Sequence, residues 1–210
     1  MAQDATLTVR LPGIDREFKI DEWIHGRLFS RVRLTTTQAA DVPAFSYVAG
    51  NIVPSGGAAA TDRDTNMGDV SKLPIGWQAL VFSHQVEFEG DVVSTSSVAG
   101  VTPSLADIRD IQNKALIVFK VGRNPIYETA ISKLPSGGGP WANGTANNFV
   151  QIGNGVPDAR NQAAFLIPLN LREGKPFSVI SRFPTQLSLT AVTYLMHWLE
   201  GLIQRPFDQA

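Results

Sequence analysis

The last third of this chain is a succession of apolar segments of strand length separated by turn residues. The segments cover residues 163–171, 177–183 and 187–206, and the turn Arg172-Glu173-Gly174-Lys175-Pro176 joins the first two. A stretch rich in Gly, Pro and Asn, residues 135–157, precedes them. Apolar strands joined by Gly- and Pro-rich loops are typical of an all-β sandwich and not of an enzyme built on alternating strands and helices.

The final segment, residues 187–205, has a second interpretation. Its apolar residues would also line one face of a helix. We favour a strand because the segment contains β-branched and aromatic residues and an interior glycine, which helices disfavour. These residues are Thr190, Val192, Thr193, Tyr194 and Gly201.

Three strands are expected in the first half of the chain, at residues 5–11, 28–35 and 77–89. In the third, alternation places Leu80, Phe82, Val86 and Phe88 on one face, with His84 among them. Residues 17–24 fit either a strand or a short helix. We expect a hairpin from residues 115–121 and 126–131, because Gly122-Arg123-Asn124-Pro125 between them is a turn sequence.

One short helix is expected over residues 104–114, with Ser104 as its N-cap and Asp107 three residues later. Residues 39–72 are mostly small and polar and predict a long loop. A loop of this length usually has a binding or assembly role, with disorder as the alternative. We therefore expect one β-sandwich domain over residues 1–210, with residues 1–20 as an N-terminal arm and residues 39–72 as an assembly loop.

Charge and composition argue against several classes of protein. The 18 basic and 19 acidic residues give a net charge of −1, with no basic stripe, so we expect no specific nucleic-acid recognition. Arg10, Arg27, Arg31 and Arg33 could form a local basic patch, but we favour a solvated face as the explanation. The absence of cysteine excludes disulfides, thiolate catalysis and Cys-based zinc sites.

The sequence carries no recognisable targeting segment. Its first residues lack the basic and apolar regions of a secretory signal. The apolar run from Leu189 to Ile203 is interrupted by polar residues and is shorter than the roughly 18 residues of a spanning helix. We expect no transmembrane segment and synthesis in a cytoplasm.

Candidate sites for chemistry are few. His25, His84 and His197 lack the spacing of a metal site. For His84 and His197 we expect a core or interface role, with a pH-sensitive subunit contact as an alternative. Asp62, Asp64 and Asn66 suggest a calcium loop, but Met67 stands where Gly is required and Leu73 where the bidentate carboxylate is required. A looser calcium site at these three residues is kept as an alternative. We predict no catalytic residues and no cofactor.

A carbohydrate-binding cleft is a further alternative. Glu87 and Glu89 would project from one strand face. Aromatic side chains on which a sugar could stack are Trp77, Trp141, Trp198 and Tyr127.

The order of segments from residue 73 to residue 206 resembles structural virion proteins of bacteriophages with jelly-roll coats. The matching pieces are Leu73-Pro74-Ile75-Gly76-Trp77 before a long strand, Lys133-Leu134-Pro135-Ser136-Gly137-Gly138-Gly139 after a hairpin, Gly153-Asn154-Gly155-Val156-Pro157 with Arg160, Ala164-Phe165-Leu166-Ile167-Pro168-Leu169 before Gly174-Lys175-Pro176-Phe177, and Leu199-Glu200-Gly201-Leu202-Ile203-Gln204-Arg205-Pro206 at the end.

This resemblance implies a jelly-roll-like double-sheet sandwich whose loops and terminal arms contact neighbouring subunits. It implies a structural subunit of a virion, most simply the major capsid protein, with copies of itself and other virion proteins as partners and no enzymatic activity. A minor decoration or vertex protein would share the fold. A β-sandwich carbohydrate-binding module or carbohydrate-active enzyme is the alternative from another class.

Overall fold

The computed structural model describes residues 6–11, 14–19, 23–53, 59–89, 92–94, 105–134, 141–144, 149–153 and 164–204. Most of these residues belong to β strands, and two antiparallel sheets of four strands form the body of the molecule.

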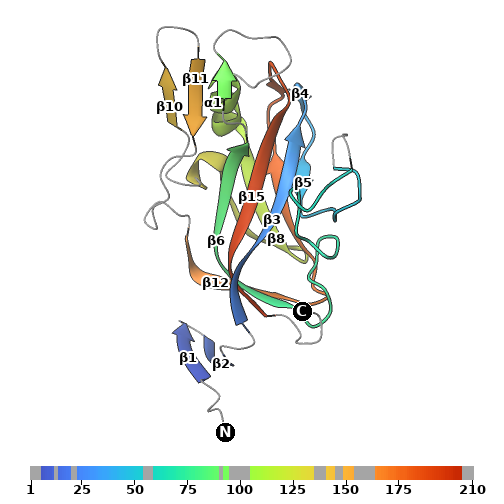
Figure 1. Ribbon diagram of the computed structural model, residues 1–210, viewed down its shortest axis with the longest axis vertical. Coiled ribbons are helices and arrows are strands. Elements are labelled where there is room, and N and C mark those ends of the chain that lie inside the picture. Colours follow the sequence, from blue (N-terminus) through green and yellow to red (C-terminus); the bar gives the residue numbers. More distant parts are fainter. Residues whose placement is uncertain are drawn as a thin grey trace.

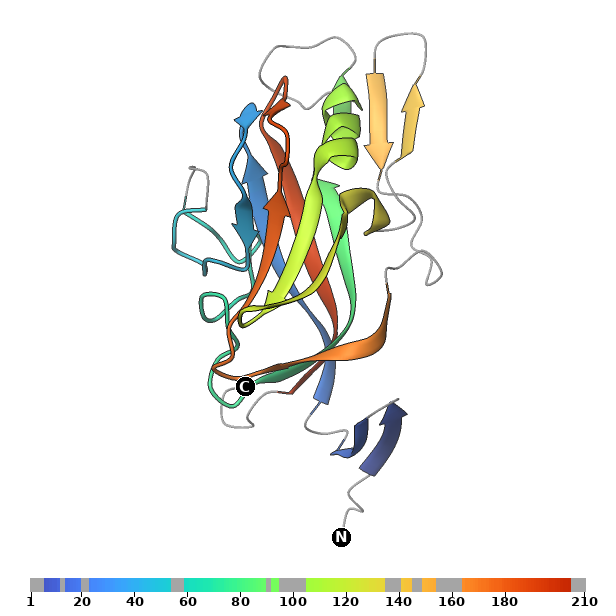
Figure 2. The same cartoon turned by 180° about the vertical axis from the view of Figure 1, so that it is seen from behind.

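The front sheet contains, in spatial order, β12 (Ala164–Arg172), β6 (Gln78–Glu89), β15 (Thr193–Gln204) and β3 (Trp23–Leu34). The back sheet contains β5 (Val42–Ala44), β13 (Phe177–Arg182), β8 (Leu116–Val121) and β9 (Asn124–Ala130). The front sheet faces the viewer in Figure 1, and the back sheet faces the viewer in Figure 2.

The strand order is that of a jelly roll. If these eight strands are numbered 1 to 8 along the chain, the front sheet reads 6-3-8-1 and the back sheet reads 2-7-4-5. Every connection therefore crosses from one sheet to the other, except the β8–β9 hairpin, and this wrapping of the chain defines the jelly roll. The prediction of an all-β, jelly-roll-like double-sheet sandwich with one short helix is confirmed.

Smaller elements extend this body. They are the hairpin of β1 (Thr6–Leu11) and β2 (Ile14–Lys19), the short pair β4 (Thr37–Gln38) and β14 (Leu187–Ser188), the three-stranded sheet of β7 (Val92–Ser94), β10 (Trp141–Gly144) and β11 (Phe149–Gly153), the helix α1 (Leu105–Lys114) and a 3₁₀ turn (Ile131–Lys133). The predicted strand 5–11 is β1. Within residues 17–24, which the sequence left open, β2 ends at Lys19 and β3 begins at Trp23.

The hydrophobic core fills the space between the two sheets. Its largest fully buried side chains include Phe45, Phe119 and Phe177. The ring of Phe177 lies 5.6 Å from that of Phe45 and 6.3 Å from that of Phe119, so aromatic contacts join the loop after β5 to the middle of the back sheet.

The C-terminal segment is a strand, as predicted. Along β15 buried and half-buried residues alternate without interruption from Thr193 to Gln204. This period of two is the pattern of a strand that covers a core with one face. Because β15 is paired with β3 on one side and β6 on the other, it is a central strand of the front sheet.

The prediction that Leu80 and Phe82 share one face of β6 with Val86 and Phe88 is wrong. Ser83 pairs with Glu200 whereas Val81 pairs with Gly201, so β6 has one extra residue at this point. Such a bulge reverses which side chains face inward. Ala79 and Val81 therefore enter the core, while Leu80 packs with Trp23 in a separate cluster that Phe82 and Leu202 complete.

The helix and the long loop are both tied to the sandwich. In α1, Ile108 and Ile111 are buried, whereas the predicted N-cap Ser104 lies outside the described residues. Asp107 accepts hydrogen bonds from the backbone N–H and the hydroxyl of Thr190. The predicted loop 39–72 contains β5, and Tyr47 and Met67 within it are buried. Within residues 135–157, the structure describes only β10 and β11.

Among the described residues, no helix combines the length and the apolar character that crossing a membrane requires.

Candidate functional site

A chain of four polar side chains crosses the core between the two sheets, three of them buried and the fourth, Tyr127, half-buried. His84 on β6 and His197 on β15 lie side by side, with Nε2 of His84 3.1 Å from Nδ1 of His197. The Tyr127 hydroxyl on β9 contacts Nδ1 of His84, and Oγ of Ser181 on β13 lies 3.3 Å from Nε2 of His197. Both imidazoles belong to the front sheet, and both hydroxyl groups belong to the back sheet.

This chain satisfies every imidazole nitrogen when both rings are neutral. Tyr127 can donate to His84, which then donates to His197, which donates to Ser181. The reverse direction satisfies the same atoms, because each neutral imidazole has one donor and one acceptor nitrogen and each hydroxyl can do both. Buried polar groups persist in a core under this condition, and the chain therefore binds the two sheets to each other.

Burial keeps both histidines neutral. Desolvation lowers the pKa of His84 well below its usual value, and the neighbouring His197 lowers it further. Desolvation lowers the pKa of His197 to about 3. Burial raises the pKa of Tyr127 above its usual value. Phe119 stacks on Tyr127 with ring centroids 5.6 Å apart, so the surroundings of the chain are aromatic.

The hydrogen-bonded side chains include the residue types of a nucleophilic catalytic site, but they are not accessible to a substrate. Ser181, His84 and His197 are all 0% exposed. A substrate must reach both the nucleophile and its base, and these three side chains have no surface exposed to it. The arrangement can accept a proton and respond to it, so it is a candidate pH-sensitive element and not a candidate catalytic centre.

The second feature is the outer sheet face, which we define as the outward side of β3, β15 and β6. In register across these strands, Met196 on β15 lies between Arg31 on β3 and Glu87 on β6, and Trp198 is the partner of Phe29. The Trp198 indole N–H donates to the Glu87 carboxylate at 3.0 Å. This observation places one predicted sugar-stacking residue beside one predicted carboxylate.

Arginine side chains lie flat on two of the aromatic rings of this face. The Arg31 guanidinium carbon is 3.8 Å from the centre of the Tyr194 ring, and that of Arg27 is 5.2 Å from the Trp198 ring. Arg33 occupies the same side of β3, whereas the side chain of Arg10 lies outside the described part of the chain. Three of the four arginines considered from sequence thus share one face.

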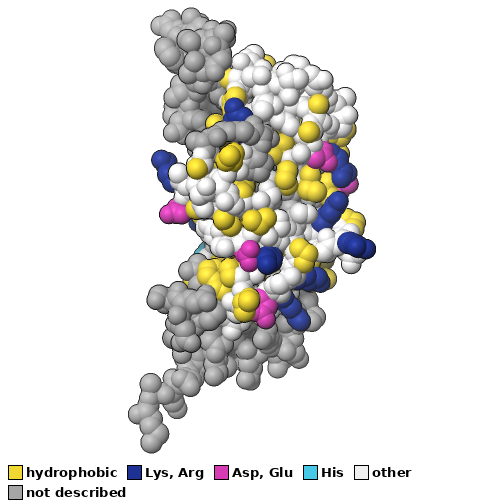
Figure 3. Space-filling view, turned by 90° about the vertical axis from the view of Figure 1, so that its right-hand side faces the viewer, with side chains coloured by type: hydrophobic (Ala, Val, Ile, Leu, Met, Phe, Trp, Pro, Cys, Tyr) yellow, Lys and Arg dark blue, Asp and Glu magenta, His cyan; other side chains and the backbone are white. Residues whose placement is uncertain are grey.

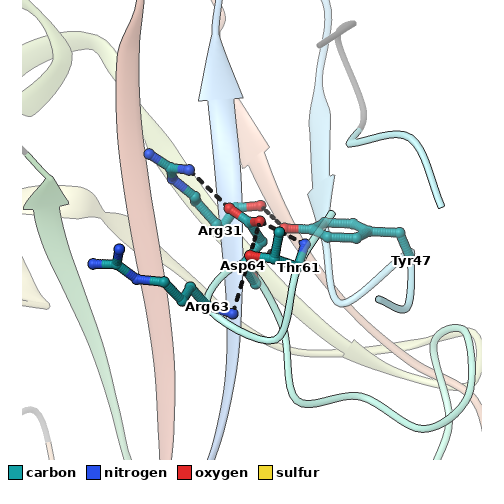
Figure 4. Close-up of polar contacts among 5 residues, drawn as sticks. All are labelled: Arg31, Tyr47, Thr61, Arg63 and Asp64. Carbon is teal, nitrogen blue, oxygen red and sulfur yellow. Dashed lines mark hydrogen bonds and ion pairs between the residues drawn. The ribbon is translucent and has the colours of Figure 1, made fainter. Parts of the chain in front are cut away.

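The residues of the suggested calcium loop form hydrogen bonds within the protein. Asp64 receives the Arg31 guanidinium at 2.7 Å on one oxygen and the backbone N–H and hydroxyl of Thr61 on the other. Figure 4 shows the Asp64 carboxylate between Arg31 and Thr61. The Tyr47 hydroxyl donates to the backbone carbonyl oxygens of Arg31 and Asp64. The Asn66 side-chain amide accepts a hydrogen bond from the Phe29 N–H and donates one to the Arg27 carbonyl oxygen, both on β3. Asp62 is exposed.

Burial acts to raise the pKa of Asp64, but the Thr61 N–H and the Arg31 guanidinium outweigh it and hold this pKa below its usual value. The structure therefore gives Asp64 and Asn66 the role of fastening residues 59–67 to β3. Within the described chain, no three His, Asp or Glu residues are grouped as metal ligands would be.

Trp77 lines a shallow cleft of about 440 Å³ at one end of the sandwich. The lining residues are Gly76, Trp77, Gln78, Arg172, Glu173 and Gln204. The Glu173 carboxylate accepts the Gly76 N–H, and Gln78 donates to Asn170 at 2.7 Å. The cleft therefore has one aromatic wall among polar groups that already bond one another.

The side of the molecule on the right of Figure 1 includes the loop that follows β5. Figure 3 shows hydrophobic side chains scattered over this side, with most Lys and Arg side chains near one margin. Its described residues form no single continuous apolar patch, in contrast to the ordered rows of the outer sheet face.

The sequence alone did not bring His84 and His197 together. They are 113 residues apart, and only the pairing of β6 with β15 makes them neighbours. The available signal was that each occupies an inward position of an apolar strand and so needs a buried partner. Comparison with known proteins adds no further guide, because no family model, no curated protein and no solved structure matches this chain.

Proposed function

We propose that this protein is a structural subunit of a bacteriophage particle, most simply its major capsid protein. The observation that supports this most is the strand order of the two sheets, because the jelly roll is the sandwich that many viral coats use. The protein would be made in the host cytoplasm and would function in the virion, with copies of itself and other virion proteins as partners. A minor vertex or decoration protein differs from this proposal only in copy number.

The free edge of the front sheet suits a subunit contact. On β12, Leu166 is 93% exposed and Ile167 is 60% exposed. The strand loses register with β6 between Ala164 and Leu169, and Pro168 within this stretch has no N–H to donate. Irregular pairing and proline protect an edge from uncontrolled strand addition. The exposed side chains are therefore available to a partner without extending the sheet.

Purification followed by light scattering and negative-stain electron microscopy tests the proposal. We expect rings, capsomers or shells, and fewer of them when Leu166 and Ile167 are both changed to serine. Ile126→Ser is the matched control, because Ile126 is equally apolar and 43% exposed but lies on β9 of the back sheet, outside the expected assembly loop. A wild-type chain that stays monomeric at every concentration would contradict a coat function.

Carbohydrate binding is the second candidate, because Trp198 lies beside Glu87 on an open sheet face and lectins also use jelly rolls. Arg27 and Phe29 both contact the Trp198 ring, so a sugar would have to displace a side chain in order to stack. A glycan array with wild type and Trp198→Ala tests this candidate. Glycan binding that Trp198→Ala abolishes would favour it over the coat function.

A further inference from the structure

The cleft beside Trp77 lies where three strands of the front sheet have their ends, at the bottom of Figure 1. Gln78 begins β6, and its partners across the sheet are Arg172 at the end of β12 and Gln204 at the end of β15. Register partners in a sheet lie on the same face. This row faces away from the core, because the adjoining residue in each of the three strands is buried inside the sandwich. Those buried residues are Ala79, Leu171 and Ile203.

The aromatic wall of the cleft is held in place by the protein. Trp77 is half-buried and packs against the hydrophobic core. Its backbone N–H donates to the Pro74 carbonyl oxygen at 3.1 Å, and the Gly76 N–H donates to the Glu173 carboxylate. The turn that carries Trp77 is therefore fastened to the end of β12. A ligand that stacks on the indole ring would not have to order this turn first.

Two charged groups in the cleft have hydrogen-bonding capacity to spare. Arg172 and Glu173 are both exposed. Among the described residues, none binds the Arg172 guanidinium, and only the Gly76 N–H occupies the Glu173 carboxylate, through one of its two oxygens. A guanidinium has five N–H donors, whereas a carboxylate only accepts. The cleft therefore has a donor group and an acceptor group beside one aromatic ring.

This lining favours an uncharged ligand that has hydroxyl groups. A hydroxyl group both donates and accepts, so two hydroxyls of one sugar ring can satisfy Arg172 and Glu173 together. The C–H groups of a pyranose ring form an apolar face that can pack on the Trp77 indole. Glu173 would repel an anion and Arg172 would repel a cation. The volume of about 440 Å³ falls within the roughly 300–1,000 Å³ of small-molecule sites.

We propose that this cleft binds a neutral pyranose sugar. The ring stacks on Trp77, one hydroxyl group accepts from Arg172 and another donates to Glu173. Because Gly76, Arg172 and Glu173 are exposed, part of the bound sugar stays in solvent, which suits one residue of a longer glycan. This inference goes beyond the proposed coat function, because it adds a binding site to the subunit and does not involve the outer sheet face.

Saturation-transfer NMR and titration with methyl glycosides test the inference. The neutral probes are the methyl glycosides of glucose, galactose, mannose and N-acetylglucosamine, and the charged probes are those of glucuronic acid and glucosamine. We expect at least one neutral glycoside to bind the wild type more tightly than either charged one. Arg172→Ala should weaken this binding about tenfold or more, because a hydrogen bond from a charged donor is lost.

The matched control is Arg123→Ala, which should bind as the wild type does. Arg123 is equally exposed but lies in the turn between β8 and β9 of the back sheet. Trp77→Leu keeps an apolar side chain against the core and removes the ring, so it should weaken binding as well. If Trp77→Leu fails to fold, Arg172→Ala still decides the matter, because it changes an exposed side chain.

Glu173→Gln tests the charge argument separately. Its amide oxygen can still accept the Gly76 N–H, but the cleft gains a net positive charge. We expect the preference to move toward methyl glucuronide by about two- to fivefold, the size of an exposed charge interaction. An unchanged preference would overturn the role of Glu173 as an acceptor for the sugar.

The remaining outcomes separate this inference from the coat function. A wild-type chain that forms particles but binds no glycoside, or only charged ones, would overturn the sugar site and leave the coat function standing. A chain that binds a neutral glycoside through Arg172 but stays monomeric would do the reverse. Binding that Trp198→Ala abolishes and Arg172→Ala leaves unchanged would overturn the site in the cleft and assign the sugar to the outer sheet face.

Discussion

Acid should destabilise this protein through His84 and His197. In the unfolded chain each imidazole has a pKa near 6.5, whereas burial lowers the folded value of His197 to about 3 and that of His84 well below 6.5. Below pH 6.5 the unfolded state therefore binds protons that the folded state does not bind. Stability contributed by the neutral pair is complete above pH 6.5 and is lost as the pH falls toward the folded values.

The size of the effect follows from this linkage. Each such group changes the free energy of unfolding by about 1.4 kcal/mol per pH unit in the window between its two pKa values. Between pH 7 and pH 5.5 the two groups together should cost about 2–3 kcal/mol. For a chain of this size that loss lowers the midpoint of thermal unfolding by roughly 5–10 °C.

Urea unfolding measured at several pH values between 7.5 and 5.5 tests this reasoning, because carboxylates titrate mostly below that window. His197→Gln should show about half of the wild-type slope, and the double change with His84→Gln should remove most of it. His25→Gln, an exposed position on β3, should keep the full slope. A flat wild-type profile, or an unchanged slope in the double variant, would refute the assignment of two buried neutral imidazoles.

Three further substitutions test other contacts. A Cβ on Gly201 would lie 1.8 Å from the carbonyl oxygen of Leu80. Gly201→Ala should therefore lower the free energy of unfolding by ~3 kcal/mol or more, or prevent folding. In Gly26→Ala the Cβ would meet only the flexible end of Ile203 at 3.0 Å, so this control variant should be tolerated in thermal unfolding. Asp64→Asn should lower the free energy of unfolding by about 1–3 kcal/mol, because charged hydrogen bonds are lost. It should also speed hydrogen exchange in residues 59–67. Asp62 is exposed, so Asp62→Asn is the control that should leave exchange unchanged. Among the described residues, nothing accepts a hydrogen bond from the buried Gln85 amide nitrogen. Gln85→Met should therefore leave urea stability equal or raise it by about 1 kcal/mol, and a clear loss would show that this amide has a partner.

The strands could be predicted from sequence because their signals are local. In β15, β-branched and aromatic residues and the interior glycine distinguished a strand from a helix. The β8–β9 hairpin followed from its turn sequence. Jelly-roll wrapping came only from the resemblance, because the order of strands across a sheet depends on pairings between distant segments.

The bulge in β6 has a sequence signal in its partner strand β15. An isolated glycine within a strand often marks a bulge or a close approach of two backbones. Gly201 is such a residue, and its position against Leu80 is what allows the extra residue of β6. The reason that Leu80 and Phe82 do not share a face with Val86 and Phe88 therefore lies in the partner strand, which the alternation within β6 cannot reveal.

The candidate sites depended even more on distant residues. The Asp64 carboxylate could be interpreted as a calcium ligand until its partner Arg31, 33 residues earlier, was known. The partners of His84 lie on β9 and β15. A polar residue in an apolar strand predicts that a buried partner exists, but the sequence does not say which segment supplies it.

The buried chain and the outer face together explain why β15 has one register. His197 lies between Met196 and Trp198, so its inward position fixes the outward position of both neighbours. A shift of one residue would turn Met196, Trp198 and the charged Glu200 inward and would leave the Tyr127 and Ser181 hydroxyls without their imidazole partners. Unpaired buried polar groups cost about 1–3 kcal/mol each, so a shifted register would lose stability at several points at once. The interior hydrogen-bonded chain thus fixes which side chains of β15 lie on the outer sheet face.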